Sequence, residues 1–187
     1  MSIYTAGKIM KQSAPLLLMG VVGGIAGGQV LNSNQSVLIA FPVFLVMFPV
    51  VNALCGNIGS ILGARLSSGL HMGTISAKSF DREFQKNISS ALLLGIISYT
   101  VLTIFVLLIS PVIGIEIESD ILFKAGYVML ATGLILTVIV IAVAVFVARF
   151  SFIKGLDPDN TVTPIVTTLC DVLGIIILIT MIGAVGI

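Results

Sequence analysis

The segment from Ala125 to Ala148 has the sequence AGYVMLATGLILTVIVIAVAVFVA and contains no charged side chain. A helix of about 20 mainly apolar residues is long enough to cross the hydrocarbon core of a bilayer. This segment exceeds that length without a single Asp, Glu, Lys or Arg. It therefore predicts a transmembrane helix, and with it an integral membrane protein.

The same shortage of charge extends over the whole chain of 187 residues, of which 9% are Asp, Glu, Lys or Arg. An ordinary soluble domain carries roughly 25%. Hydrophobic residues make up 58% of the chain and the mean hydropathy is +1.22, which excludes a disordered chain and an ordinary soluble globule. A net charge of +1 gives no sign of a nucleic-acid-binding surface, so the expected surroundings are a lipid bilayer and no nucleic acid.

Further uncharged stretches at 12–64, 87–115 and 172–187 predict the remaining spans. The first is long enough for two helices, with a polar turn at 31–36 between them. We expect an all-α polytopic membrane protein with five transmembrane helices, a single integral membrane domain over residues 1–187 without a soluble regulatory domain. The expected helices cover about 13–31, 37–56, 88–112, 122–148 and 161–186.

Lysine and arginine placement predicts the orientation, because cytoplasmic loops are enriched in both residues. With the N-terminus in the cytoplasm, only Lys124 falls on the outer side. We therefore expect an N-in, C-out, multi-pass protein of the cell membrane. The residues expected on the cytoplasmic side are Lys8, Lys11, Arg65, Lys78, Arg82, Lys86, Arg149 and Lys154.

Glycines in the first expected helix form overlapping GxxxG pairs, namely Gly20, Gly23, Gly24, Gly27 and Gly28. Small residues allow helix backbones to approach closely in lipid. Packing within the chain and packing across a dimer explain this pattern equally well.

The second expected helix contains Pro42, Pro49 and Asn52, followed by the glycine-rich residues 55–60. Prolines and an amide inside a span suggest an interrupted backbone facing a polar cavity, as in discontinuous helices that line ion sites. A buried asparagine bonded to a neighbouring helix explains the pattern nearly as well.

The two cysteines, Cys55 and Cys170, have no CxxC spacing and no obvious partner at the same depth. Buried free cysteines commonly behave as small apolar residues. We therefore expect both to be packing residues.

Asp171 is the carboxylate that the sequence places inside a span. If the last helix begins near Asn160 or Thr161, a rise of about 1.5 Å per residue puts Asp171 about 15 Å deep, in the middle of a core about 30 Å thick. Ionisable residues at such depth are costly, and their default interpretation is functional. Asp157 and Asp159 are candidates for the cap of this helix.

One face of the last helix is small or polar, because Gly174, Asp171, Thr167, Thr163 and Asn160 follow helical spacing. Such a face is typical of a helix that lines a hydrophilic path. A proton relay, an ion pair with an arginine or a cation site could each use the buried carboxylate. A cation site in a twofold dimer is favoured, since two carboxylates would neutralise one divalent ion and oxygen ligands suit Mg2+.

Two motifs resemble the MgtE family of divalent-cation channels and transporters. Residues 49–60, PVVNALCGNIGS, which run on to Arg65, resemble the second-helix motif of that family. Residues 156–165, LDPDNTVTPI, followed by TTLCD at 167–171, resemble its DPDN…TP…D stretch at the last helix, especially in the eukaryotic solute-carrier branch. The expected helix number and topology agree with the family.

This resemblance implies a homodimer with a pore on its twofold axis that selects Mg2+ partly through its hydration shell. It implies that Asp171 is the central pore carboxylate and that Thr167 and Thr163 shape the site. By the same resemblance Asp157 lies at the cytoplasmic mouth, and Asn57 belongs to the second-helix motif together with Gly56.

The chain departs from its relatives in length. Bacterial MgtE proteins carry an N-terminal domain and paired CBS domains that sense Mg2+, whereas this chain has about a dozen residues before its first expected span. Their mode of gating therefore cannot be carried over. The eukaryotic relatives hold two five-helix units in one chain, so two copies of this chain would supply an equal number of helices.

Mg2+ transport is the favoured function, with other divalent cations as further candidates. A structural or regulatory membrane subunit that transports nothing, and an exchanger coupled to Na+ or H+, remain as alternatives. The sequence contains none of the HExxH, GxSxG or dinucleotide-binding motifs, and we do not expect an enzyme.

Overall fold

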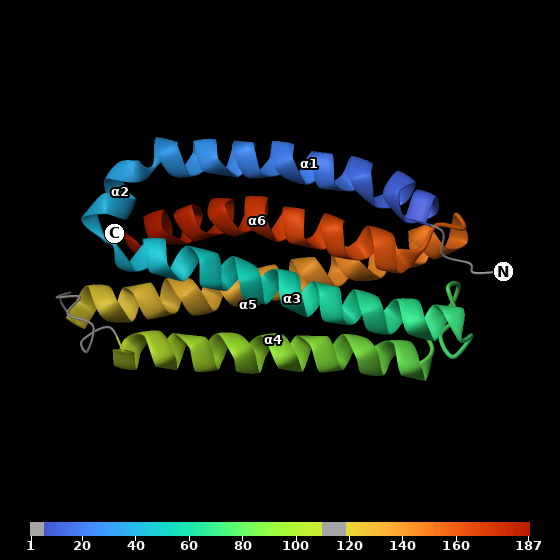
Figure 1. Ribbon diagram of the computed structural model, residues 1–187. Coiled ribbons are helices and arrows are strands. Elements are labelled where there is room, and N and C mark those ends of the chain that lie inside the picture. The colour runs from blue at the N-terminus through green and yellow to red at the C-terminus, as the bar shows by residue number, and fades with distance from the viewer. Residues whose placement is uncertain (1–5, 110–118) are drawn as a thin grey trace.

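The structure, a computed structural model, describes residues 6–109 and 119–187 as a bundle of long helices lying side by side (Figure 1). Within these ranges there is no strand, which confirms the expected all-α class. The helices are α1 (Ala6–Ser33), α2 (Gln35–Ala40), α3 (Val43–His71), α4 (Arg82–Ile109), α5 (Ser119–Ile153) and α6 (Pro158–Val185).

Five of these helices, all except the six-residue α2, are long and apolar enough to cross a membrane. The predicted polytopic membrane fold is therefore confirmed. The largest difference in bounds concerns α3, which continues from the expected end at residue 56 to His71. Hydropathy marks only the apolar part of a helix, whereas the backbone stays helical beyond it. Residues 110–112 of the third expected span lie outside the described residues.

The predicted interruption after Pro49 is wrong. Pro49 lies inside α3, and residues 55–60 are helical. The break falls earlier, between α2 and α3, where Pro42 precedes the first residue of α3 with φ −58°. A proline suits the start of a helix because its fixed φ is helical and its missing N–H would have no partner there.

The basic residues gather at one end of the bundle, where α1 and α6 begin and the α3–α4 and α5–α6 connections lie (Figure 1). Lys124 lies at the other end, in the first turns of α5, where its Nζ is 2.9 Å from Asp120 Oδ2. This is the asymmetry from which the N-in, C-out orientation is predicted. The residues at the first end are Lys8, Lys11, Arg65, Lys78, Arg82, Lys86, Arg149 and Lys154.

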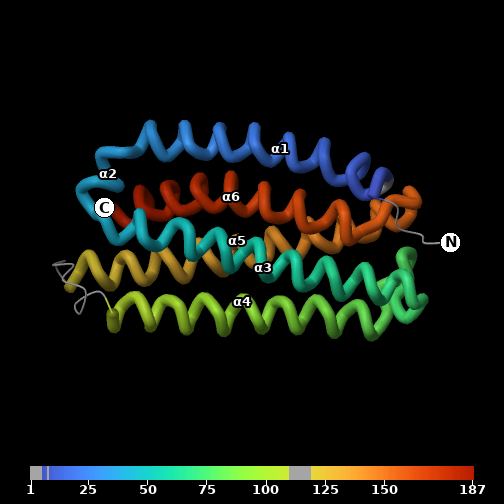
Figure 2. Tube along the Cα trace, in the orientation of Figure 1, coloured from blue at the N-terminus to red at the C-terminus, as the bar shows by residue number. Residues whose placement is uncertain are grey.

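α6 packs against three other helices, α1, α3 and α5 (Figure 2). α4 lies on the far side and packs on α5 and α3. α1 is peripheral. Only 6% of its apolar membrane-spanning stretch is buried inside the molecule, against 44% for the corresponding stretches of α3 and α5. The helix that carries Asp171 is therefore held from several sides, and α1 covers one edge of it.

Glycines allow α1 to lie close to α6. A Cβ atom at Gly20 or Gly23 would come within 2.9 Å of the Thr168 side chain, and one at Gly27 would lie 2.7 Å from Ile175 Cδ1. The other two glycines of the overlapping motif have no atom within 4 Å of such a Cβ. Three of the five motif glycines thus serve packing within the chain.

The contact between α3 and α6 also depends on glycine. A side chain at Gly59 would overlap Val166, and one at Gly63 would lie 2.5 Å from Val162 Cγ1. Both valines are fully buried. Backbone of α3 therefore lies directly against β-branched side chains of α6, and this close approach leaves no room for a methyl group.

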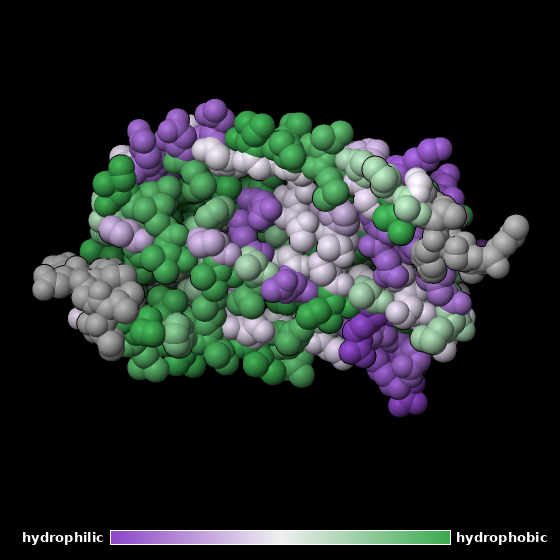
Figure 3. All heavy atoms as spheres, in the orientation of Figure 1, coloured by the Kyte–Doolittle hydropathy of each residue, from purple (hydrophilic) through white to green (hydrophobic). Residues whose placement is uncertain are grey.

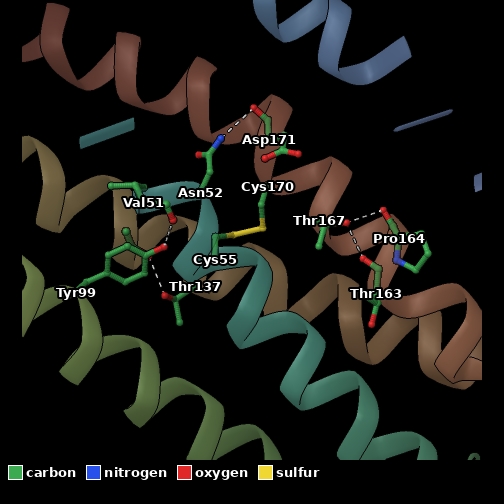
Figure 4. The surroundings of a disulfide bond; sticks show 11 residues. Val51, Asn52, Cys55, Tyr99, Thr137, Thr163, Pro164, Thr167, Cys170 and Asp171 are labelled. Atoms are coloured by element: carbon green, nitrogen blue, oxygen red, sulfur yellow. Dashed lines mark hydrogen bonds between the residues drawn. A yellow bond between two sulfur atoms is a disulfide. The ribbon is translucent and has the colours of Figure 1, made fainter. Parts of the chain in front are cut away.

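A buried amide joins the same two helices at mid-length. Asn52 of α3 is only 6% exposed, and its Nδ2 donates a hydrogen bond to the main-chain oxygen of Asp171 at 3.4 Å (Figure 4). Its Oδ1 lies where a side chain at position 174 would be, so Gly174 makes room for the amide. The interpretation of Asn52 as a buried amide bonded to a neighbouring helix is confirmed.

The expectation that the cysteines are unpaired packing residues is wrong. Cys55 and Cys170 form a disulfide between α3 and α6, with a Cα–Cα distance of 5.9 Å (Figure 4). The two helices run antiparallel, and each cysteine lies near the middle of its helix. The sequence placed Cys55 at the end of a shorter helix, which hid the fact that the two residues share one depth.

Replacing Gly174 with alanine should destabilise the fold, because the new methyl group would overlap Asn52 Oδ1. Overpacking of this kind costs roughly 1–3 kcal/mol. The measurement is the thermal unfolding midpoint of the purified protein in detergent. Gly183→Ala is the matched control on the same helix, since no atom lies within 4 Å of its added Cβ. Equal midpoints for the two variants would contradict the described contact.

The disulfide predicts the thiol content of protein purified without reductant. After denaturation, a maleimide should add to neither cysteine unless a dithiol reductant is applied first, after which intact mass should show both adducts. The Cys55→Ser/Cys170→Ser variant should unfold more easily, by roughly 2–4 kcal/mol. Labelling of both cysteines without reduction would show that the bond is absent.

Candidate cation site

Asp171 lies in the middle of α6, roughly 20 Å from each end of the helix at about 1.5 Å per residue. Its side chain is exposed on the surface of the single chain. A carboxylate at mid-membrane that faced lipid would be costly. A carboxylate at this position of a spanning helix therefore calls for polar neighbours.

No basic side chain neutralises Asp171 within the described residues, where the ion pairs are Lys86–Glu83 and Lys124–Asp120. Arg65 and Arg149, the arginines to be considered as partners of Asp171, are engaged elsewhere. Arg65 Nε donates to Asn87 Oδ1 at 2.7 Å, and an Arg149 guanidinium nitrogen donates to the main-chain oxygen of Ser79 at 2.6 Å. Asp171 therefore forms no ion pair within the part of the chain that the structure describes.

Hydroxyl oxygens continue the polar face of α6 from Asp171 toward the basic end of the bundle. Thr163 is exposed and Thr167 is half-buried. The Thr167 hydroxyl donates to the main-chain oxygens of Thr163 at 2.9 Å and Pro164 at 3.2 Å (Figure 4). Because its proton is directed to the helix backbone, the oxygen keeps acceptor capacity for water or a cation.

α3 borders this face along its glycine-rich segment. A Cβ at Gly56 would lie 3.3 Å from Thr167 Cγ2, and the neighbouring Asn57 is exposed. Figure 3 shows hydrophilic and weakly polar surface that reaches from the basic end of the bundle to its middle, whereas the surface near the opposite end is mostly hydrophobic. The structure thus brings Asp171, Thr167 and Thr163 onto one face of α6, with Asn57 on the adjoining helix.

Asp157 occupies a different position, at the first turn of α6. It is 6% exposed and caps the helix, with Oδ1 accepting a hydrogen bond from the Asp159 main-chain N–H at 3.1 Å. Its main-chain oxygen accepts from the Thr161 hydroxyl at 3.2 Å. The cap role considered for this residue is confirmed, and the cap fixes where α6 begins.

Among the residues that the structure describes, no group of three or more His, Cys, Asp or Glu side chains lies close enough to hold a metal ion. What the polar face offers is one carboxylate with hydroxyl, amide and main-chain oxygens. These are hard ligands, which suit Mg2+ or Ca2+ rather than metals that prefer sulfur.

Sequence reasoning missed the link between Asp171 and the α3 residues beside it. The adjacent Cys170 is bonded to Cys55, and the main-chain oxygen of Asp171 accepts from Asn52. The residues on both helices lie near the middle of their helix, and this shared depth could have indicated the contact. It follows from the sequence only if the second helix is continued to His71.

The chain is similar to known proteins. The MgtE family model, described as a divalent cation transporter, matches residues 48–181. A relative from Rattus norvegicus, solute carrier family 41 member 3, is 28% identical over 178 residues; the match covers 89% of this chain. The chain spans 37% of the length of that relative. No solved structure matches the chain. Since the family model covers more than half of it, this multi-pass membrane chain belongs to the MgtE family of divalent cation transporters.

Proposed function

We propose that the chain carries Mg2+ across the cell membrane through a pore on the twofold axis of a homodimer, with Asp171 of each copy forming the central cation site. The observation that carries this proposal is the exposed Asp171 side chain at the middle of a membrane-spanning helix. A second polar surface must cover it, and a second copy of the same face supplies one.

Charge favours a dimer over a single chain. Two carboxylates on an axis bring a charge of about −2, which one divalent cation neutralises. A lone carboxylate would leave a divalent cation with an uncompensated positive charge in a medium where unpaired charge is costly. The proposed pairing therefore removes the unfavourable charge of both the protein and the ion.

The oxygen ligands favour Mg2+ among divalent cations. Mg2+ loses its water shell reluctantly and is commonly held by one or two carboxylates with several waters retained. Thr167 and Thr163 would accept hydrogen bonds from those waters, and the exposed Asn57 amide would do so from the α3 side. Asp157 would contribute negative charge at the mouth, which lies on the cytoplasmic side in the proposed N-in, C-out orientation.

The Asp171→Asn variant should lower Mg2+ flux into proteoliposomes by at least roughly tenfold, because removing both charges should weaken cation binding by more than about 1.4 kcal/mol. Flux is measured with a Mg2+-sensitive dye inside vesicles that contain the purified chain alone. The dimer should persist, which size-exclusion chromatography with light scattering checks.

Asp159→Asn is the matched control, since Asp159 is an exposed carboxylate in the first turn of the same helix. Undiminished flux in Asp171→Asn would exclude Asp171 from the site. Absence of flux in the unmodified chain would instead favour a non-transporting subunit. Dependence on an imposed Na+ or H+ gradient would identify a coupled exchanger.

A further inference from the structure

An apolar groove runs beside α1, with one part between α1 and α6 and the other between α1, α5 and the first turns of α6. It consists of two adjoining cavities of about 310 and 450 Å³, and Leu16 and Ile165 border both. The groove opens because α1 packs along α6 and leaves the side toward α5 uncovered. Its other apolar lining residues include Met19, Val172, Phe146, Val147, Phe150 and Leu156.

The groove is centred on a different side of α6 from the candidate cation site. At about 100° per residue, Ile165 and Leu169 lie roughly 120° and 160° around α6 from Asp171, whereas Pro164 and Thr168, at roughly 20° and 60°, form the edge of the groove nearer to that site. A dimer that pairs the Asp171 faces would therefore leave this groove toward the bilayer. In that position the natural neighbours of an apolar groove are acyl chains.

Two lysines flank the end of the groove at the basic end of the bundle. Lys11 lines the larger cavity directly. Lys154 lies over the ring of Phe150, with Nζ 5.8 Å from its centroid, and Phe150 lines the same cavity. Both lysines are exposed, and neither makes an ion pair in the described part of the chain.

The acidic residues at the start of α6, the buried Asp157 and the exposed Asp159, make no ion pair with either lysine in the described part of the chain. Asp157 is buried as the cap of α6, with Oδ1 bonded to the main-chain N–H of Asp159. Gln12, beside Lys11, accepts a hydrogen bond from Asn160 Nδ2 at 3.0 Å, which ties the start of α1 to the start of α6. This end of the apolar groove thus carries two exposed lysines that form no ion pair in the described residues.

We propose that this groove is a binding site for one anionic phospholipid. An acyl chain fills the two cavities beside Leu16 and Ile165, and the phosphate lies between Lys11 and Lys154. The lysines at the membrane boundary suit the anionic headgroup of such a lipid, and the apolar cavities beside them suit its acyl chains. The exposure of the groove to the bilayer rests on the dimer of the proposed function, whereas the lipid itself takes no part in ion transport.

Native mass spectrometry of the delipidated protein in detergent tests the proposal, with dioleoyl phosphatidylglycerol or dioleoyl phosphatidylcholine added at equal concentration. One phosphatidylglycerol molecule should be retained roughly thirtyfold more tightly, as about 1 kcal/mol for each lysine predicts. The Lys11→Gln/Lys154→Gln variant should lose this preference. The Lys78→Gln/Arg82→Gln variant, which loses equal charge at the same end of the bundle, should keep it.

A second pair of variants tests the groove itself. Leu16→Trp should fill it and abolish retention of the lipid, whereas Leu18→Trp, at a 68% exposed position on the same helix, should not. Equal retention of the two lipids, or unchanged retention in Leu16→Trp or in the double lysine variant, would overturn the proposal. A change of oligomeric state in Leu16→Trp would also overturn it, because the groove would then be an interface between copies.

Discussion

The close contact between α3 and α6 is the constraint on which the other features depend. Glycines of α3 lie against valines of α6, Asn52 donates to the main chain at Asp171, and a disulfide joins the helices one residue away. Together these contacts fix the rotation of α6 about its axis. That rotation turns the Asp171 side chain outward, while a different side of α6 lines the groove beside α1.

A charged group at mid-membrane is tolerated only where its surroundings compensate for lost hydration. The chain meets this requirement by placing Asp171 on a face with hydroxyl and amide neighbours rather than on an apolar one. The basic residues collect at one end of the bundle, where α6 begins with its capped first turn. The proposed path for a cation therefore leads from a charged membrane boundary along oxygen atoms to a single carboxylate of each copy.

Sequence patterns predicted much of the fold, because the spacing of charges marks membrane spans directly. Asp171 and its threonine face also followed from helical spacing. The disulfide and the continuity of α3 through Pro49 did not, since both depend on how two helices pack. Hydropathy ended the second helix near residue 56 and so placed Cys55 at a membrane boundary instead of beside Cys170. The role of the α1 glycines likewise depends on packing, because only tertiary contacts show that Gly20, Gly23 and Gly27 face α6.

The central claim, that two copies pair through their Asp171 faces, is tested most directly by cross-linking at that position. Asp171→Cys is introduced into the Cys55→Ser/Cys170→Ser background, and membranes are oxidised with copper phenanthroline. A covalent dimer that a reductant reverses is the predicted result. Thr180 is exposed on the opposite side of α6, so Thr180→Cys in the same background should give little covalent dimer. Efficient cross-linking at 180 with none at 171 would contradict the proposed pore on the twofold axis.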